Sequence, residues 1–342
     1  MAAIVSPWTG QQGHCGSASL RMKILFHTPH ADEAPAWLAS LARALPSADV
    51  RLWTPGDEAP ADYAIVWRPP AELFAPRAGL RAVFVLGAGV DALLALERSR
   101  PRTLPAGVPL VRLEDTGMAA QMAEYAVYAT LRYMRRFDEY ELAQRQPRQP
   151  GIEGRWQVLE PHPRETFHVG VLGLGALGAH VAKALAMLGL PVRGYSRTQK
   201  SIDGVATFAG EDRLPAFLDG LKLVVNLLPS TPATDGILNR TTFSHLARGA
   251  YLVNLARGAH VVERDLIDAL DEGRLAAATL DVFAQEPLPP AHPFWHMPRV
   301  TVTPHISALT LREPAVDQIA RKIGALARGE AIGGIVDPSR GY

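Results

Sequence analysis

The sequence predicts an α/β protein made of two doubly wound parallel sheets. Short β-branched and apolar runs recur along the chain and alternate with helical or loop stretches, as in parallel sheets covered by helices. These runs form two sets of about five and six strands, one on either side of a long helical pattern. The length of 342 residues also exceeds that of a typical single core and suits two domains.

The predicted elements follow in chain order. The first set of strands lies at Lys23–His27, Val50–Trp53, Tyr63–Trp67, Ala82–Leu86 and Pro109–Leu113. A helix is expected from Met118 to Tyr133, where apolar residues repeat at helical spacing and Asp115 or Thr116 is available as the cap. Repeated Pro and Gly over 145–163 indicate a linker or surface excursion. The second set of strands lies at His168–Gly173, Pro191–Ser196, Lys222–Leu228, Ala250–Leu255, Ala277–Asp281 and Val300–Thr303.

Composition excludes several classes of protein. Thirty-five Lys and Arg against 34 Asp and Glu leave a net charge of +1, which offers no electrostatic footprint for nucleic acid or an anionic membrane. No uncharged apolar run reaches the ~20 residues of a membrane helix. The single cysteine, Cys15, excludes an internal disulfide and a thiolate-rich zinc site. Residues 1–21 lack the features of a secretory signal and are predicted to be an N-terminal extension, so we expect a cytoplasmic protein.

A glycine motif opens the second set of elements. Gly173, Gly175 and Gly178 stand in the spacing Gly-x-Gly-x-x-Gly, directly after an apolar strand and before a helical pattern. The three glycines serve the tight turn, the close approach of a pyrophosphate and the packing of helix on strand. The motif, with Ala176 and Leu177 inside it, therefore predicts a dinucleotide site. The alternatives are a merely structural turn or another nucleotide-like ligand such as S-adenosylmethionine.

The next strand ends in a basic, hydroxyl-rich turn. Ser196, Arg197, Thr198 and Lys200 stand where an NAD site usually has a carboxylate for the ribose 2′-hydroxyl. No carboxylate is present to repel a 2′-phosphate, and Arg197 can clamp one. The turn therefore favours NADP, with NADPH preferred over NADH; the alternative is a solvated basic turn.

Three later segments each bring a polar residue to the end of a predicted strand. These residues are Arg257, Glu286 and His305. Strand C-termini line the ligand crevice of an open α/β sheet. A guanidinium, a carboxylate and an imidazole there supply what reduction of a 2-oxoacid requires. Taken singly, Arg257 also fits a surface ion pair, Glu286 a turn and His305 a helix cap.

A metal site is the competing interpretation of the histidines. His292, His296 and His305 lie near one another in the sequence. Pro293 prevents the first two from sharing a helix face, so no metal is expected.

The motifs together resemble the D-2-hydroxyacid dehydrogenase family over most of residues 22–342. The resemblance implies that Arg257, Glu286 and His305 are catalytic, with His305 as the general acid. The motifs that carry it are Gly173-x-Gly-x-x-Gly178, Leu228-Pro-x-Thr231-Pro, Asn254-x-Ala-Arg-Gly258, Leu280-Asp-Val-Phe-x-x-Glu-Pro287 and Thr303-Pro-His305. The cofactor would further be bordered by Leu228, Pro229, Thr231, Leu255, Ala256 and Asp281.

The resemblance also implies a domain arrangement. A Rossmann domain at 120–305 would be inserted into a smaller flavodoxin-like substrate domain made of 22–119 and 306–342. The helix that begins at Met118 would also contribute to a homodimer contact.

Further segments are similar to a bacterial branch of the family that reduces glyoxylate and hydroxypyruvate with NADPH. They are Val66-Trp67-Arg68-Pro-Pro70, Leu86-Gly-Ala-Gly-Val-Asp91, Arg112-Leu-Glu-Asp-Thr-Gly-Met118, Arg135-Arg-Phe-Asp138 and the C-terminal 336–342. The branch implies the products glycolate and D-glycerate. The expected substrate pocket contains Trp67, Arg68, Ala88 and Gly89 in addition to Arg257 and His305. Another acid substrate, or a non-catalytic dinucleotide-sensing role like that of corepressors with this fold, stays open.

Overall fold

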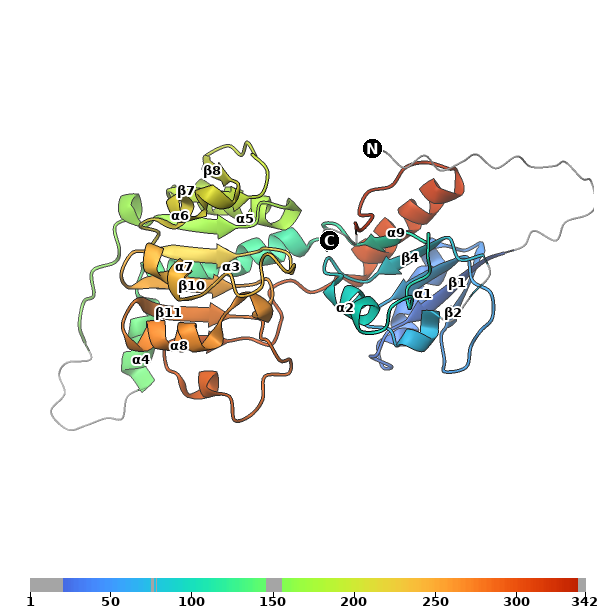
Figure 1. Cartoon of the computed structure of the whole chain (residues 1–342), viewed down its shortest axis with the longest axis horizontal. Coiled ribbons are helices and arrows are strands. Elements are labelled where there is room, and N and C mark those ends of the chain that lie inside the picture. The colour runs from blue at the N-terminus through green and yellow to red at the C-terminus, as the bar shows by residue number, and fades with distance from the viewer. Residues whose placement is uncertain (1–20, 75–76, 78, 146–155, 338–342) are drawn as a thin grey trace, which may run out of the picture. The chain divides into compact units, whose positions relative to one another are not determined.

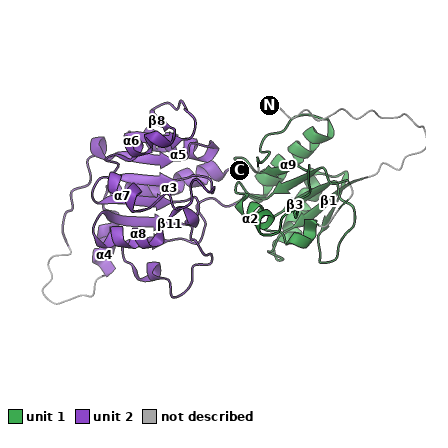
Figure 2. Ribbon diagram, viewed as in Figure 1, with its two compact units in different colours: residues 1–116, 310–342 green, residues 117–309 purple. Residues whose placement is uncertain are grey.

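The computed structural model describes residues 21–74, 77, 79–145 and 156–337 (Figure 1). The N-terminal extension with Cys15, most of the Pro/Gly-rich stretch and the last five residues lie outside the described ranges. The chain divides into two compact units, coloured separately in Figure 2. Unit 1 comprises Met1–Thr116 and Thr310–Tyr342, and unit 2 comprises Gly117–Leu309.

Unit 1 contains a five-stranded parallel sheet in the order β2-β1-β3-β4-β5, the order of a flavodoxin-like fold. The central strands β3 and β4 are buried along their whole length, which explains their continuous apolar sequence. The C-terminal helix α9 packs against α1. The element bounds are β1 Met22–His27, α1 Ala34–Ala44, β2 Ala48–Leu52, β3 Tyr63–Val66, β4 Ala82–Val85, α2 Asp91–Ser99, β5 Leu110–Arg112 and α9 Arg312–Ala327.

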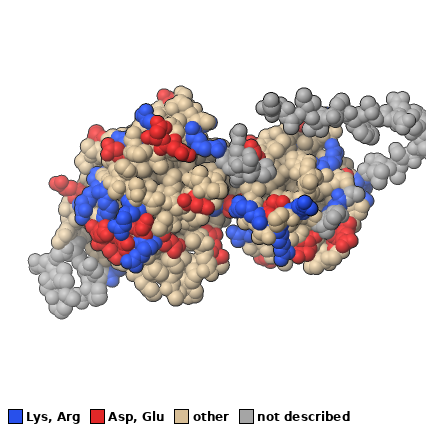
Figure 3. Space-filling view, viewed as in Figure 1, with Lys and Arg blue, Asp and Glu red and all other residues tan. Residues whose placement is uncertain are grey.

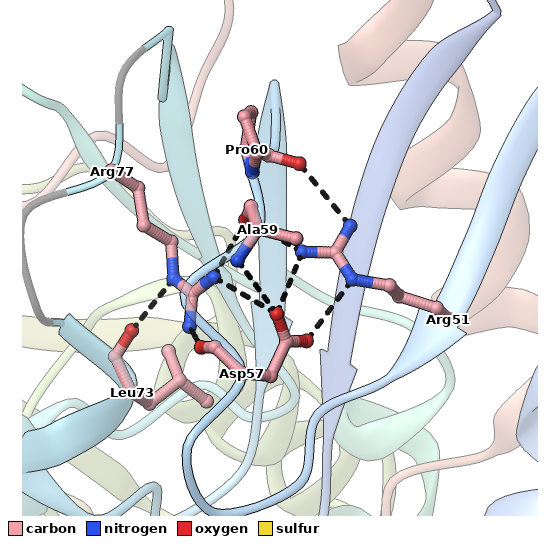
Figure 4. A network of polar contacts seen from close by, with 6 residues as sticks. All are labelled: Arg51, Asp57, Ala59, Pro60, Leu73 and Arg77. Atoms are coloured by element: carbon pink, nitrogen blue, oxygen red, sulfur yellow. Dashed lines mark hydrogen bonds and ion pairs between the residues drawn. The ribbon is translucent and has the colours of Figure 1, made fainter.

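A polar network closes the loop that follows β2 (Figure 4). Asp57 accepts hydrogen bonds from Arg51 Nε at 3.0 Å and from the amide of Ala59 at 2.9 Å. Arg77, whose side chain is 1% exposed, reaches the same carboxylate at 3.4 Å and donates to the carbonyl of Ala59 at 2.7 Å. Burial alone would raise the pKa of Asp57, but these hydrogen bonds and the two guanidinium charges lower it. The loop is therefore held by a partly desolvated ion pair.

Unit 2 contains a seven-stranded parallel sheet in the order β12-β11-β10-β9-β6-β7-β8. The strand order reverses between β6 and β9, which is the switch point of a Rossmann fold. The strands are β6 Val169–Leu172, β7 Val192–Ser196, β8 Val205–Ala209, β9 Leu223–Asn226, β10 Ala250–Asn254, β11 Leu275–Leu280 and β12 Val300–Val302. The helices are α3 Met118–Met134, α4 Phe137–Arg145, α5 Ala176–Met187, α6 Leu214–Leu218, α7 Arg240–His245 and α8 Glu263–Asp271.

The structure confirms the predicted fold class and differs from the sequence prediction in two details. The strand β8 was not predicted, because this edge strand is only partly buried and lacks the fully apolar sequence of its neighbours. The N-cap residue of α3 is Gly117, at φ +91°, and not the predicted Asp115 or Thr116. Glycine adopts that left-handed backbone without steric cost.

The surface of each unit carries charged side chains of both signs, interspersed in the view of Figure 3. On unit 2, Arg240 pairs with Asp268 at 2.9 Å and with Glu272 at 3.3 Å. Within the described ranges, no helix is both long and apolar enough to cross a membrane.

Candidate active site

The glycine loop joins β6 to α5, and steric limits differ at its three glycines. A Cβ on Gly178 would lie 1.7 Å from the carbonyl oxygen of Gly173, so helix and strand approach as closely as the motif predicts. Gly173 has φ +98°, and a Cβ there would lie 2.6 Å from the carbonyl oxygen of Leu227. A Cβ on Gly175, by contrast, has no heavy atom within 4 Å. The loop therefore presents open space at Gly175, beside the positive end of the α5 dipole.

The basic turn lies directly after β7. Ser196 is the last residue of the strand, and its hydroxyl donates to the carbonyl of Thr198 at 2.7 Å. Arg197, Thr198 and Lys200 are all exposed. The turn thus places hydroxyl and cationic side chains at the carboxyl end of the strand next to the glycine loop.

Glu286 and His305 meet at the carboxyl ends of β11 and β12. Nδ1 of His305 lies 2.8 Å from Oε2 of Glu286, and the other carboxylate oxygen accepts from the amide of Phe283 at 3.1 Å. Since Nδ1 is engaged by the carboxylate, Nε2 is the ring nitrogen that can exchange a proton with a ligand. The His305 side chain is 39% exposed, so a ligand can reach it.

Arg257 lies in the loop after β10, the strand next to β11. Its side chain is half-buried, and one terminal nitrogen donates to the carbonyl of Ala256 at 2.6 Å. A Cβ on the adjacent Gly258 would lie 1.8 Å from the carbonyl carbon of Phe283, so this loop touches the segment that leads to Glu286. The loops that carry Arg257 and Glu286 are therefore in contact.

Asp281 is fully buried and holds the segment around His305. Its Oδ1 accepts from the hydroxyl of Thr303 at 2.6 Å and from the amide of Ile306 at 2.8 Å, while Oδ2 accepts from the amide of Ser307 at 2.8 Å. His305 between them has φ +56°, a backbone conformation that is unfavourable for a residue with a side chain. The Asp281 carboxylate thus stabilises the turn that presents His305, a contact that sequence reasoning did not foresee.

Tyr125 of α3 extends this support. Its hydroxyl lies 2.7 Å from Thr303 Oγ1. Because Thr303 donates to Asp281, Tyr125 must be the donor to Thr303. Burial raises the pKa of Tyr125 to about 12, which keeps its proton in place for that hydrogen bond.

The expected cofactor-lining residues after β9 and β10 are mostly enclosed. Leu228, Leu255 and Ala256 are buried, whereas Pro229 and Thr231 are half-buried. Beneath these loops lie the buried side chains of Asn226 and His260, which sequence reasoning did not single out. No short motif signals either of them, because the side-chain contacts that join Asn226 to Asn254 and to His260 span 28 and 34 positions of the sequence.

Unit 1 brings its four expected pocket residues to the carboxyl ends of β3 and β4. The Trp67 ring lies against Gly87, where a Cβ would be 2.6 Å from the ring carbon Cζ3. The Arg68 guanidinium lies 5.7 Å from the centre of that ring, with φ +41° at its own backbone. Ala88 and Gly89 follow in the half-buried loop after β4. A larger residue at position 87 would displace the indole.

Two of the three histidines considered as metal ligands, His292 and His305, make other contacts. His292 lies 3.2 Å from Glu263 through Nε2, and its Nδ1 accepts from the amide of Phe294. Among the residues that the structure describes, no group of three or more His, Cys, Asp or Glu side chains has the arrangement of a metal site.

Comparison with known proteins agrees with the motifs. Residues 127–307 match the family profile of the D-isomer specific 2-hydroxyacid dehydrogenase NAD binding domain. A glyoxylate/hydroxypyruvate reductase A from Serratia proteamaculans is 58% identical over 321 residues, which cover 94% of this chain and 100% of the relative. A protein of the same name from Yersinia enterocolitica is 56% identical over the same shares of both chains.

Solved structures show the same relationship. A D-isomer specific 2-hydroxyacid dehydrogenase from Xanthobacter autotrophicus Py2, in complex with NADPH and MES, is 42% identical with a TM-score of 0.86, covering 94% of this chain and 100% of that chain. An NADPH-dependent glyoxylate/hydroxypyruvate reductase from Sinorhizobium meliloti, in complex with NADP and sulfate, is 33% identical with a TM-score of 0.84 over the same shares. The resemblance read from the motifs is thereby confirmed, and the chain belongs to the D-isomer specific 2-hydroxyacid dehydrogenase family.

Proposed function

We propose that the chain is an NADPH-dependent reductase of small 2-oxoacids, which converts glyoxylate to glycolate and hydroxypyruvate to D-glycerate. The observation that carries this proposal is the 2.8 Å contact between Glu286 and His305, at the strand ends of the sheet that also holds the glycine loop. The relatives named glyoxylate/hydroxypyruvate reductase A support the substrate class. The related structures in complex with NADPH and NADP support the cofactor.

The residues at the strand ends fit a dinucleotide. The space beside Gly175 and the α5 N-terminus suits a pyrophosphate, and the turn from Ser196 to Lys200 suits a 2′-phosphate because it contains no carboxylate. When bound, the reduced nicotinamide supplies the hydrogen and the two electrons that reduce the substrate carbonyl. We assign the rest of the cofactor site to Gly173, Ala176, Leu177, Gly178, Leu228, Pro229, Thr231, Leu255, Ala256 and Asp281.

Two residues of unit 2, Arg257 and His305, then act on the substrate, and Glu286 orients the ring of His305. The Arg257 guanidinium binds the carboxylate and polarises the adjacent carbonyl. His305 holds a proton at Nε2 and donates it to the carbonyl oxygen as negative charge develops there. Glu286 receives the Nδ1 hydrogen bond at 2.8 Å, which selects the ring orientation that directs Nε2 to the substrate.

We assign residues 120–305 to the dinucleotide-binding domain, and residues 22–119 with 306–342 to the substrate domain. In the substrate domain we assign Trp67, Arg68, Ala88 and Gly89 to the pocket. The stacking of Arg68 on Trp67 supports this assignment, since it holds a cation beside an indole at one strand end. A rigid indole would limit the pocket to acids with two or three carbons.

We further propose a homodimer and a cytoplasmic location. Unit 2 has a cavity of about 430 Å³, and its lining includes Tyr128 of α3 and Trp295. Tyr128 is 63% exposed and Trp295 is 50% exposed. Exposed aromatic side chains beside a cavity are typical of a protein interface. Light scattering of the purified protein tests the dimer, with Tyr128→Arg expected to yield monomers. Fractionation of the source cells tests the location.

The activity test follows the loss of nicotinamide absorbance with NADPH or NADH and each of glyoxylate, hydroxypyruvate and pyruvate. We expect fast oxidation of NADPH with glyoxylate and hydroxypyruvate. His305→Gln should lower kcat by about 100-fold or more while NADPH still binds. His292→Gln is a matched control, because His292 also pairs with a glutamate of unit 2, Glu263, but at 3.2 Å and outside the proposed site.

Other outcomes of this assay point to different functions. Oxidation of NADPH with pyruvate alone would replace the assignment of glyoxylate and hydroxypyruvate as substrates. NADPH binding without turnover on any oxoacid would favour the sensing role. Full activity of His305→Gln would refute the assignment of His305 as the general acid.

A further inference from the structure

Three polar side chains lie buried beneath the loops after β9 and β10. Asn226 and Asn254 are the last residues of these two strands and face each other in the parallel register. His260 ends the short 3-10 turn Gly258–His260 that follows Arg257. All three residues are 0% exposed, so each polar atom must find a partner within the protein.

The hydrogen bonds among them have a defined direction. Nε2 of His260 lies 3.2 Å from the carbonyl oxygen of Pro229, which can only accept, so Nε2 carries the proton. Nδ1 is then the acceptor, and it accepts a hydrogen bond from Nδ2 of Asn226 at 2.8 Å. The same Asn226 amide donates to Oδ1 of Asn254 at 2.9 Å. Asn254 in turn donates from Nδ2 to the carbonyl oxygen of Arg257 at 2.9 Å.

The side-chain carbonyl oxygens of both asparagines also accept hydrogen bonds from nearby main-chain amides. Oδ1 of Asn226 accepts from the amide of Leu228 at 3.2 Å, and Oδ1 of Asn254 accepts from the amide of Ala256 at 3.2 Å. The network therefore ends on the main chain of two loops. One carries Leu228 and Pro229, which are assigned to the cofactor; the other carries Arg257, which is assigned to the substrate carboxylate.

We propose that His260, Asn226 and Asn254 are positioning residues that hold the cofactor loop and the Arg257 loop in one fixed relative geometry. This inference rests on the proposed function, because it assigns the two loops to two reactants. Reduction of a carbonyl requires donor and acceptor carbons to be aligned closely, and a misplacement of ~1 Å can lower the rate by about 100-fold. A continuous buried network between the two loops supplies that alignment without adding a charge to the site.

His260 is the residue to perturb, because its two ring nitrogens serve the two loops separately. Asparagine at position 260 is short and offers its carbonyl oxygen near the place of Nδ1, so it keeps the contact with Asn226 and loses the donor to Pro229. Glutamine is longer and offers its amide near the place of Nε2, so it keeps the donor to Pro229 and loses the acceptor for Asn226. His260→Leu removes both contacts.

The two polar variants should each change a different Michaelis constant, one for NADPH and the other for glyoxylate. For His260→Asn we expect KM for NADPH to rise about 3- to 10-fold, with little change in KM for glyoxylate. The rise is limited because Thr234 also donates to the Pro229 carbonyl, at 2.7 Å. For His260→Gln we expect the opposite pattern, because the asparagine pair that supports Arg257 loses an acceptor. His260→Leu should also lower kcat by about 10- to 100-fold.

A spectroscopic measurement tests the network without relying on turnover. A long-range proton–nitrogen NMR spectrum at about pH 7, compared with that of His260→Gln, identifies the His260 signals among the 11 histidines. We expect the neutral tautomer with the proton on Nε2. The Nδ1 tautomer or an imidazolium would overturn the proposed directions of the hydrogen bonds.

The outcomes separate this inference from the proposed function. Wild-type protein that reduces none of the oxoacids would refute the proposed function, whatever the NMR result. Active wild-type protein with variants that lower kcat and stability together, and leave both KM values unchanged, would refute the positioning role and leave the function intact. If His260→Leu does not fold, the Asn and Gln variants still decide the question.

Discussion

The close packing of α5 on the glycine loop leads to a quantitative prediction for Gly178→Ala. The added Cβ would lie 1.7 Å from the carbonyl oxygen of Gly173, whereas real Cβ atoms essentially never approach other heavy atoms within 3.0 Å. The N-terminus of α5 must therefore withdraw by roughly 1.3 Å or the turn must open. Overpacking of this kind costs about 1–3 kcal/mol of the free energy of unfolding. For a unit of this size, each kcal/mol lowers Tm by about 2–4 °C.

The same displacement moves the amides that are proposed to bind the pyrophosphate. We therefore expect Gly178→Ala to weaken NADPH binding by about 10-fold or more as well as to lower Tm. Gly175→Ala is the matched control, because its Cβ has no heavy atom within 4 Å and its φ of −70° suits alanine. That variant should keep its Tm and lose NADPH affinity only, because its methyl group occupies the space proposed for the phosphates.

Thermal unfolding and titration of NADPH fluorescence measure the two effects separately. Wild-type stability in Gly178→Ala would show that the turn relaxes freely and would refute the steric argument. A loss of stability in Gly175→Ala would show that the loop is not open there. Unchanged NADPH affinity in both variants would refute the proposal that this loop binds the pyrophosphate.

Three further predictions concern cofactor preference and the pH dependence of stability. Ser196→Asp should lower the preference for NADPH over NADH by about 10-fold or more, because a carboxylate would repel the 2′-phosphate; Ser196→Ala controls for loss of the hydroxyl, and an unchanged ratio in the Asp variant would refute the 2′-phosphate site. Burial raises the pKa of Asp138 to about 6 and its Oδ1 has no hydrogen-bond partner, so the charged carboxylate destabilises the folded state increasingly as the pH rises from about 4 to 6. Asp138→Asn should therefore raise the urea midpoint at about pH 7.5 and not at about pH 3.5, and a lower midpoint at the higher pH would contradict this sign. Asp57 makes stability depend on pH in the opposite direction, because its pKa is lowered in the folded state. Its contribution to the free energy of unfolding is therefore present above about pH 4 and is lost as the pH falls through the pKa of the folded state. Asp57→Asn should lower the urea midpoint at neutral pH and reduce the fall of that midpoint at acid pH. Glu330→Gln, which breaks an exposed ion pair with Arg328, should change the urea midpoint little.

Several features of the fold follow from local patterns. The central strands of both sheets can be predicted from the sequence, because parallel strands are buried on both faces and are therefore continuously apolar, as in β3 and β10. The edge strand β8 escaped prediction because it is only partly buried. The cap of α3 was also missed, because a left-handed Gly117 rather than a polar side chain precedes the helix.

For the candidate site, the sequence placed Arg257, Glu286 and His305 each at the end of a predicted strand, and it placed the glycine loop between strand and helix. It did not reveal the support beneath them. Asp281 holds the turn around His305 across 22 or more residues, and Asn226 contacts residues 28 and 34 positions away. Such contacts depend on the register of neighbouring strands, which no short motif encodes.

The sequence by itself therefore determined the fold class and the family, and it predicted which side chains react, because local periodicity and motif spacing carry that information. Only the tertiary structure decided that Glu286 and His305 lie 2.8 Å apart and that His260 faces both Pro229 and Asn226. The physical reason is that hydrogen bonds form within about 3 Å, and only folding brings residues so far apart in the chain to that distance with their donors and acceptors aligned.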